Sequence, residues 1–366
     1  MLGPALQPEV RQAEARIDQT AELPFIGSFI FNLIRKGAKP LPNFTLHRFC
    51  TAPMLGATDR HFRNFVRFLS RKAFVYSELV HCHAITKGNY RIELTENAAA
   101  HPAALQLAGC DPDSLREASY AAFQNGFNEI NLNIGCPSPK GVISNFGLCL
   151  MDDPELTAKC VRACVQGSPL PVSVKCRLGS NPGYTQEQLL RFLELNMEAG
   201  CRCFIVHARK ADMQSWDPAK NRTKPPLDYE AVYALKQRWP EIEWIVNGDI
   251  KTAEQALEHL RYVDGVMLGR ALYHNIFMLA SVDSLFFGLP DRIGSRREFL
   301  LDKVIPYIQP RLEQGQPLSH FVRHLLSLYQ HRNRANAWRR FLAENAYKPG
   351  ASADILYRAL DIAEGE

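Results

Sequence analysis

Between residues 44 and 268, short apolar segments alternate with longer amphipathic ones. One of the short segments places Ile130, Leu132 and Ile134 around Asn131 and Asn133, and this period of two is typical of a half-buried strand. The longer segments repeat their apolar residues every three to four positions, which predicts helices. The expected strands are 44–49, 74–79, 103–107, 128–134, 171–176, 202–207, 242–247 and 263–268, and the expected helices between them are 58–70, 112–125, 154–165, 185–199, 228–238 and 252–261.

Eight strands separated by helices over about 240 residues have the size of a (β/α)₈ barrel. A doubly wound open sheet is the alternative, although no Gly-x-Gly-x-x-Gly follows the first strand. The link from Cys82 to Pro102 has no clear amphipathic helix. After Gly288-Leu289-Pro290 the pattern becomes all-helical, with helices expected at 295–313, 318–331, 334–345 and 352–363. We therefore predict an α/β fold with three parts: an extension (1–44), a TIM-barrel catalytic domain (45–289) and a small all-α helical bundle (290–366).

Composition agrees with a protein of the cytoplasm. The 366 residues are 46% hydrophobic and 22% charged, which is ordinary for a globular chain. Ten cysteines without a Cys-x-x-Cys pair fit neither a zinc site nor a secreted disulfide scaffold, so we expect reduced thiols. The apolar run 23–34 is shorter than the roughly 20 residues of a membrane helix, and the acidic residues before it are unlike a signal peptide. We expect no membrane association.

A metal site is not expected. The tripeptide His81-Cys82-His83 resembles a ligand cluster, but adjacent residues at a strand end point in opposite directions and no fourth ligand is apparent.

In a barrel, the carboxyl ends of the strands supply the active site. Each expected strand here ends near polar or small residues, and a lone lysine or histidine among them is more often structural. Taken together they favour an anionic ligand. Glycines follow strands seven and eight, where barrels commonly bind phosphate, and Arg270 adds a bidentate donor. Lys175 and His207 are suited to an anionic ring such as a reduced flavin.

Cys136 stands just after the fourth strand, between Gly135 and Pro137. A lone cysteine is most often a buried structural residue. Its place at a strand end, beside the other polar residues of the expected barrel mouth, instead favours a functional thiol.

Five ordered motifs resemble those of the tRNA-dihydrouridine synthases. They are Ala52-Pro53-Met54 with Thr58-Asp59, Asn131-x-Asn133-x-Gly135-Cys136-Pro137-Ser138, Val174-Lys175-x-Arg177, His207-Ala208-Arg209-Lys210 and Asn247-Gly248. Pro225-Pro226-Leu227-Asp228-Tyr229 and Trp338-Arg339-Arg340 look like the A-type branch, which acts on U20 and U20a of the tRNA D-loop. The resemblance extends over residues 45–345.

The resemblance implies an FMN-containing barrel that reduces the C5–C6 bond of a tRNA uridine, with NADPH as reductant. Hydride would pass from flavin N5 to uridine C6 while Cys136 protonates C5, and Asn133 would hold the uracil. Arg209 and Arg222 would contact tRNA. The residues implied to bind FMN are Pro53, Met54, Gln106, Lys175, His207, Asn247, Gly248, Gly269 and Arg270.

This chemistry suits the residues. Because a thiol is mostly protonated at neutral pH, it can act as a general acid. A uridine in folded tRNA must also leave its stack to reach a barrel mouth.

A basic stretch in the tail supports RNA binding independently. Residues 319–340 contain no Asp or Glu, and arginines alternate there with aromatic residues, which suits phosphate contact and base stacking. A solvated helix face is the alternative. The arginines are Arg323, Arg332, Arg334, Arg339 and Arg340, and the aromatic residues include Phe321, Tyr329 and Trp338.

The chain departs from the A-type pattern at three places. Residues 139–142 replace Asp-Arg-Val-Gln, Asp249 stands where the branch has a third glycine, and a lysine near Arg222 is displaced to Lys220. Two other functions stay open: a flavin-dependent reductase of a free pyrimidine, and a tRNA-binding barrel without catalysis. We expect a monomer.

Overall fold

The computed structural model describes residues 46–87, 100–138, 141, 145–212 and 220–365. They fall within one compact unit that spans Thr45–Glu366. The predicted extension 1–44 lies outside the described residues, as do residues 88–99 of the link from Cys82 to Pro102 and residues 139, 140, 142–144 and 213–219. No helix among the described residues is long and apolar enough to cross a membrane.

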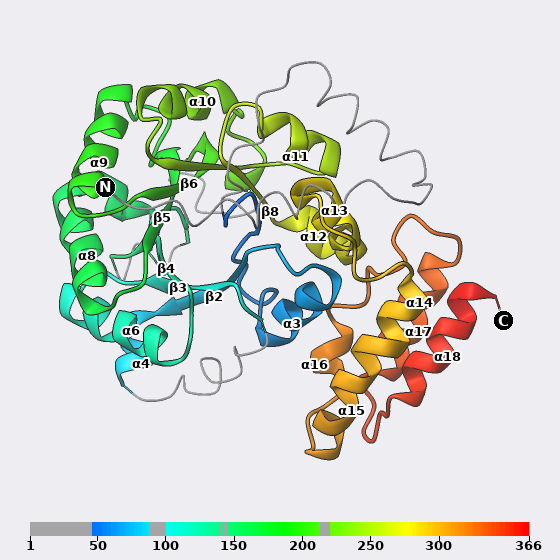
Figure 1. Cartoon of the computed structure of the whole chain (residues 1–366). Coiled ribbons are helices and arrows are strands. Elements are labelled where there is room, and N and C mark those ends of the chain that lie inside the picture. Colours follow the sequence, from blue (N-terminus) through cyan, green and yellow to red (C-terminus); the bar gives the residue numbers. More distant parts are fainter. Residues whose placement is uncertain (1–45, 88–99, 139–140, 142–144, 213–219, 366) are drawn as a thin grey trace, which may run out of the picture. The chain divides into compact units, whose positions relative to one another are not determined.

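Eight parallel strands form a closed barrel, as predicted (Figure 1). Their order is β1-β8-β7-β6-β5-β4-β3-β2, and β1 returns to the segment before β2 through the bridge between Cys50 and Phe74. The open-sheet alternative is therefore excluded. The strands are β1 (Phe49–Thr51), β2 (Val75–His81), β3 (Ala103–Ala108), β4 (Glu129–Asn133), β5 (Val172–Gly179), β6 (Cys203–Lys210), β7 (Glu243–Asn247) and β8 (Gly265–Leu268).

Helices alternate with these strands and cover the barrel (Figure 1). Aspartate or threonine side chains cap the first turns of many of them, as Asp111 and Asp153 do, each before a proline in the first turn. The helices are α3 (Arg60–Leu69), α4 (Cys82–Thr86), α6 (Pro112–Gln124), η1 (Gly147–Asp152), α8 (Pro154–Gly167), α9 (Gln186–Glu198), η3 (Lys220–Arg222), α10 (Tyr229–Arg238), α11 (Ala253–His259), α12 (Arg270–His274), η4 (Ile276–Ser281) and α13 (Val282–Phe287).

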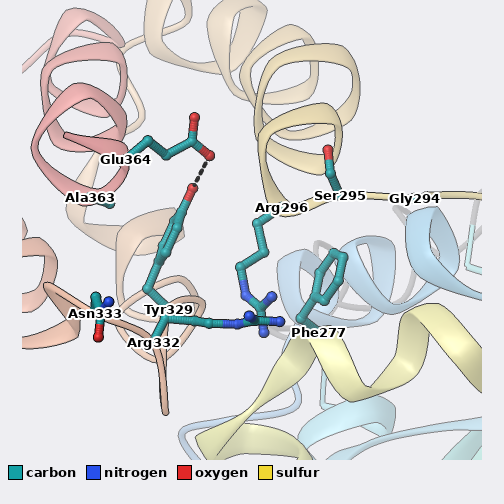
Figure 2. A pocket seen from close by; sticks show the side chains of 9 residues that line it. All are labelled: Phe277, Gly294, Ser295, Arg296, Tyr329, Arg332, Asn333, Ala363 and Glu364. Atoms are coloured by element: carbon teal, nitrogen blue, oxygen red, sulfur yellow. Dashed lines mark hydrogen bonds between the residues drawn. The ribbon is translucent and has the colours of Figure 1, made fainter. Parts of the chain in front are cut away.

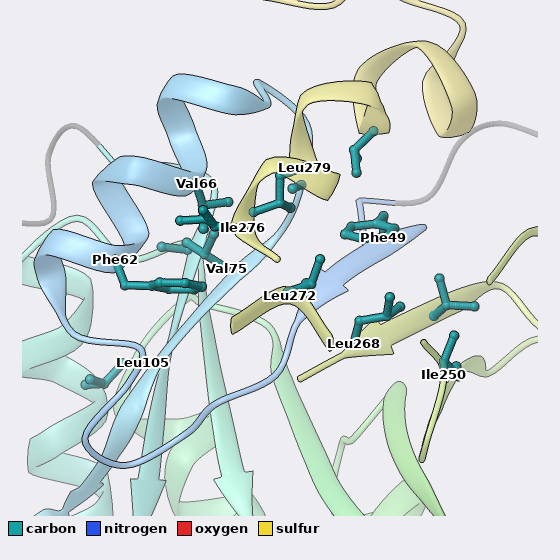
Figure 3. Close-up of a cluster of buried hydrophobic side chains, with 14 of the residues drawn as sticks. Phe49, Phe62, Val66, Val75, Leu105, Ile250, Leu268, Leu272, Ile276 and Leu279 are labelled. Carbon is teal, nitrogen blue, oxygen red and sulfur yellow. The ribbon is translucent and has the colours of Figure 1, made fainter. Parts of the chain in front are cut away.

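The core lies mainly between the strands and these helices. Phe62 and Val66 of α3 belong to one apolar cluster with Val75 of β2, Leu268 of β8 and Leu272 of α12 (Figure 3). A second, smaller cluster fills part of the barrel interior. Burial on both faces explains a difference from the sequence: β4 was expected to be half-buried, yet all five of its residues are buried, because its asparagines face the barrel interior.

The first strand lies further along the chain than predicted. It spans Phe49–Thr51 instead of 44–49, and the preceding described residues form a turn. This turn buries His47 against Glu129 and Glu243, while Leu46 stays exposed. His47, which the apolar alternation placed within a strand, instead makes polar contacts in the turn before β1.

The tail is helical, with two corrections. The predicted helix 318–331 is only α16 (Ser319–Val322), followed by tight turns in which Leu325 N–H donates to Val322 O (2.8 Å) and Leu328 N–H to Leu325 O (2.9 Å). The predicted helix 295–313 contains a π-helical segment just before Pro306, which cannot donate a backbone hydrogen bond. The tail elements are α14 (Arg296–Glu298), η5 (Phe299–Val304), α15 (Ile305–Glu313), α16, α17 (Ala335–Asn345) and α18 (Asp354–Glu364).

Asp59 links the tail to the barrel. It caps α3 by accepting from Phe62 N–H (2.9 Å), and its carboxylate also contacts Arg323 and His324 (3.0 Å). Burial alone would raise the pKa of Asp59, but the contacts from His324, Phe62 N–H and Arg323 hold it well below its usual range. Tail and barrel share one apolar cluster, so the division at residue 290 stays a prediction.

Candidate active site

The loop after β4 carries Cys136 at the mouth of the barrel. The Asn133 side-chain oxygen accepts from the N–H groups of Cys136 (3.1 Å) and Gly135 (3.3 Å). From the next strand, Arg177 Nε donates to Gly135 O (2.9 Å). Cys136 is partly exposed as a residue. The loop is thus held from two sides while Cys136 is not fully buried.

A close approach by Gly147 holds the same loop from a third side. Leu148 N–H donates to Cys136 O (3.1 Å), and Gly147 has φ +75°. A Cβ added at Gly147 would lie 2.8 Å from Cys136 O. Only glycine fits this approach without a shift of the cysteine loop.

Below the loop, amides fill the barrel interior with a hydrogen-bonded chain. Asn133 donates to Gln106 Oε1 (2.9 Å), Gln106 to Asn131 Oδ1 (2.7 Å), and Asn131 to Ser173 Oγ (2.7 Å). Ser173 in turn donates to Glu129. Gln106 is 1% exposed and has both ends of its amide in use, so here it orients the two asparagines; direct contact with a cofactor stays a prediction.

The chain continues into a charged cluster at the opposite end of the barrel. His47 Nε2 lies 2.6 Å from a Glu129 oxygen, and His47 Nδ1 lies 2.9 Å from a Glu243 oxygen and 4.0 Å from Cys203 Sγ. Burial alone would lower the pKa of His47, but Glu129 and Cys203 raise it well above its ordinary value. We interpret the cluster as an imidazolium between two carboxylates. His47, Cys203 and Glu243 also have the geometry of a metal-ligand group, which the sequence did not reveal because they are far apart in the chain.

Four cations at the mouth lie near enough to His207 to act on its charge, and one of them, Arg177, lies 3.5 Å from its ring; the others are Lys175, Arg209 and Arg270. Burial, followed by these charges, holds the pKa of His207 well below its ordinary value, so its ring is neutral. Burial, with Arg177 nearby, lowers the pKa of Lys175 to about 8. Such a group of cations is suited to an anionic ligand.

The loops after β1, β7 and β8 form one wall of the mouth. A Cβ added at Gly269 would lie 3.2 Å from Ala52 Cβ and 3.4 Å from Met54 Sδ. Gly248 has φ +130°, and a Cβ there would lie 3.1 Å from Leu227 Cδ2. A side chain at either position would crowd these neighbours. Because both residues are glycines, only backbone atoms lie at this part of the wall, beside the cations.

The donors on this wall fit FMN. Lys175 Nζ donates to Asn247 Oδ1 (3.3 Å), and Asn247 Nδ2 donates to Met267 O (2.7 Å), which fixes the ammonium at the mouth. Arg270 is 43% exposed. A partly buried ammonium suits a reduced flavin ring, and an accessible guanidinium suits a phosphate. Pro53 and Met54 are partly buried in the loop after β1.

Asp249 lies among these cations. Its carboxylate is 3.6 Å from Arg270, 3.9 Å from Arg209 and 3.4 Å from Lys251. Arg209 is buried and also donates to Pro225 O, whereas Arg222 is exposed in η3. Their contacts with tRNA stay predictions.

The tail differs from the RNA-binding surface predicted from its sequence in two respects. The aromatic residues Phe321, Tyr329 and Trp338 are buried in the core, so they are not presented for stacking on bases. The stretch has no acid of its own, but Arg323 and His324 pair with Asp59 of the barrel. Sequence distance hid that partner.

Other tail arginines are exposed: Arg332, Arg334, Arg339 and Arg340. A cavity of about 430 Å³ is lined by Arg332 and by Arg296, whose guanidinium lies over Phe277 (Figure 2). On its other side, Tyr329 donates to Glu364 (2.9 Å; Figure 2). This surface offers positive charge, but its contacts with RNA stay a prediction.

At His81-Cys82-His83, the two rings lie 5.1 Å apart and Cys82 is buried. His83 lies 3.6 Å from Asp111. Residues 139, 140 and 142 of the altered loop, and Ala219, lie outside the described residues.

Sequence reasoning assigned no role to Arg177, which the structure places against the cysteine loop. Its place on one strand face with Lys175 was visible, but not its contacts with Gly135 O, Asn221 O (3.1 Å) and His207 Nδ1 (3.5 Å). The spacing of Lys175 and Arg177 predicts that they lie on one face of the strand. The residues that this face contacts are seen only in the folded barrel.

A (β/α)₈ barrel with a partly exposed cysteine and several cations at the carboxyl ends of its strands is the arrangement of a barrel enzyme, in which the active site lies at that end. The sequence matches the family model described as dihydrouridine synthase over residues 50–362. The chain belongs to the dihydrouridine synthase family, and the resemblance seen in its motifs is confirmed.

Curated relatives are similar over most of their length. A protein of Shewanella oneidensis named tRNA-dihydrouridine(20/20a) synthase is 44% identical over 310 residues, which is 84% of this chain and 91% of that protein. Proteins of the same name are 43% identical over 319 residues in Pasteurella multocida (87% and 97%) and 42% identical over 309 residues in Synechocystis sp. (84% and 92%).

Proposed function

We propose that the protein reduces uridines 20 and 20a of tRNA to dihydrouridine, with FMN as cofactor and NADPH as reductant. The observation that carries the proposal is the partly exposed Cys136 at a barrel mouth with several cations, on a loop held by Asn133 and Arg177 and closely approached by Gly147. The names of the relatives supply the uridine positions. The cytoplasm, where thiols stay reduced, suits the ten free cysteines.

Bound FMN would supply the hydride that adds to C6 of uridine. The addition builds negative charge at C5 and O4, and Cys136 would quench it by donating its proton to C5. A well-placed general acid is typically worth about 10²–10⁴ in rate. The neutral His207 and the ammonium of Lys175 would face the flavin ring, where Lys175 offsets the charge of its reduced form.

Asn133 would orient both the acid and the substrate. Its side-chain oxygen accepts hydrogen bonds from the loop N–H groups, and one N–H of its amide donates to Gln106. The second N–H of the amide would then donate to a uracil carbonyl. Arg177 would keep the cysteine loop in place at the mouth through Gly135 O.

The exposed tail arginines Arg334, Arg339 and Arg340, with Arg222, would hold the tRNA backbone. Since the uridine must leave its stack, backbone contacts outside the mouth would carry much of the affinity.

The test is to purify the full chain, record its visible spectrum and measure dihydrouridine formed in unmodified tRNA with NADPH. Cys136→Ala should retain flavin and lose about 10²–10⁴ in rate. Cys110→Ala is the matched control, because Cys110 is another partly exposed cysteine, next to the cap of α6. Wild-type activity of Cys136→Ala would contradict the proposed acid.

The same experiment separates the alternatives. A colourless protein that binds tRNA would indicate a barrel without catalysis. Flavin-dependent turnover of free uracil or orotate, without reduction of tRNA, would indicate a reductase of free pyrimidines.

A further inference from the structure

The Asp249 carboxylate is an unusual feature of an anion site. It lies 3.6 Å from Arg270 and 3.9 Å from Arg209, two of the four cations near His207. Lys251, from the same loop, is 3.4 Å away. A negative side chain of the protein thus already contacts the guanidinium that is best exposed to receive a phosphate.

The backbone fixes this arrangement. Asp249 has φ +53°, a left-handed conformation that Asp and Asn tolerate better than other side chains. The preceding Gly248 O accepts from the Tyr229 hydroxyl, so the loop is anchored to α10. The Asp249 side chain is 30% exposed, which leaves it at the mouth rather than in a separate structural pair in the core.

Two anions compete for one guanidinium at such a site. Any phosphate bound by Arg270 would meet the Asp249 carboxylate within a few ångströms, and like charges at that distance repel. Either the Asp249 carboxylate moves away from Arg270 when the phosphate binds, or Arg270 neutralises the negative charge of the phosphate only in part.

We propose that Asp249 is a built-in anion that occupies Arg270 and Arg209 in the absence of ligand and so weakens binding of the phosphate of FMN. The inference rests on the proposed function, because it concerns the same cofactor. Asp249 is a specificity-determining residue in this view: it reduces the advantage that FMN has over riboflavin, which carries the same ring without the phosphate.

The test uses the full chain freed of flavin and titrated with FMN and, separately, with riboflavin, following flavin fluorescence. Asp249→Asn should tighten FMN binding by about two- to fivefold and leave riboflavin binding unchanged, because partly exposed ion pairs have effects of this order. Asparagine keeps the size of the side chain and tolerates the left-handed backbone, so the fold should persist. Thermal unfolding checks this, and Asp249→Gly, which suits φ +53° equally, should show the same selectivity change.

Glu254→Gln is the matched control. It removes one negative charge from the first turn of α11, in the same loop–helix unit, where Glu254 is hydrogen-bonded to Thr252. No ion pair of Glu254 with an arginine is seen in the described part of the chain. Its FMN and riboflavin affinities should both match those of the wild type.

Other outcomes overturn the inference. Weaker FMN binding by Asp249→Asn would mean that the carboxylate positions Arg270 for the phosphate. An equal change for both flavins, or the same change in Glu254→Gln, would mean that the phosphate is not what Asp249 opposes. In all three cases the wild type still binds FMN and the proposed function stands. If the wild type bound neither flavin, the proposed function would fail and this inference with it.

Discussion

Arg177 contacts the cysteine loop, the carbonyl of Asn221 and the ring of His207, although its side chain is buried in the barrel. Its neighbours at the mouth include other cations, so burying this guanidinium carries a free-energy cost that its hydrogen bonds offset. Arginine suits this position because its long, forked side chain donates to Gly135 O and Asn221 O together, which a shorter or unbranched side chain would not reach.

Arg177→Lys should therefore lower the rate of uridine reduction by about 10–100-fold, because the charge stays but the cysteine loop loses its brace. Flavin content should remain near that of the wild type. The rate of Cys136 alkylation should also change, since the loop moves. An unchanged reduction rate would show that Asn133 and Gly147 suffice to hold the loop.

His47 sets a pH dependence of stability at the other end of the barrel. Its ring is flanked by Glu129 and Glu243, with Cys203 beside Nδ1 and Cys50 Sγ donating to His47 O (3.2 Å). The folded protein holds the pKa of His47 well above its ordinary value. In the unfolded chain a histidine releases its proton near pH 6.5.

The stabilisation from this proton should be complete below about pH 6.5 and decline as pH rises toward the folded pKa, by up to about 1.4 kcal/mol per pH unit. Urea unfolding at a series of pH values measures it. The free energy of unfolding of His47→Gln should be lower than that of the wild type and should change less with pH over this range. His320→Gln, at an exposed histidine, should keep the wild-type slope; a wild-type slope in His47→Gln would rule out the charged cluster.

At the scale of elements, the turn into η1 decides where Cys136 lies. Gly147→Ala should destabilise the protein by about 1–3 kcal/mol and lower activity per folded molecule, because φ is +75° and the new Cβ would meet Cys136 O. Gly288→Ala tests conformational strain alone: φ is +66°, and nothing lies within 4 Å of its added Cβ. It should lose stability and keep activity. Equal loss of activity in both variants would disprove a specific contact with the cysteine loop.

The predicted helix 318–331 shows what periodicity leaves open. Its apolar residues Phe321, Val322, Leu325 and Leu328 recur every three residues or so, which fits an α-helix and a run of tight turns equally over a short stretch. The structure has the tight turns, and in it Arg323 and His324 both reach Asp59 of the barrel. The neighbouring π-helical segment was hidden for a similar reason, since Pro306 marks a disturbance but not its form.

At the scale of the whole molecule, the exposed arginines of the tail should bind tRNA through its phosphates. Replacing Arg340 or Arg334 by Gln should weaken binding and reduce the slope of log affinity against log salt by about 0.7–0.9 per residue. Arg358→Gln, an exposed arginine of α18 that lies over Phe341, is the control and should change neither. Filter binding at several salt concentrations measures the slopes. An unchanged slope in the tail variants would place the RNA surface elsewhere.

The sequence alone predicted the barrel, the order of its strands along the chain and a shared mouth for the residues at the strand ends, and the closed sheet then excluded the open-sheet alternative. Strand and helix periods are local properties, and strand ends of a barrel converge, so Cys136, Lys175, His207 and Arg270 could be assigned to one mouth before any coordinates. The family motifs were local as well, which is why the membership could be expected.

Tertiary structure alone decided the partners. The pairing of Asp59 with Arg323, of Asp249 with Arg270 and of His47 with Glu129 joins residues that sequence spacing cannot relate. The sequence likewise did not predict that Phe321, Tyr329 and Trp338 are buried and therefore not available to stack on RNA bases. Hydrogen bonds and ion pairs depend on distances of a few ångströms, and those are set only when the barrel closes and the tail packs against α3.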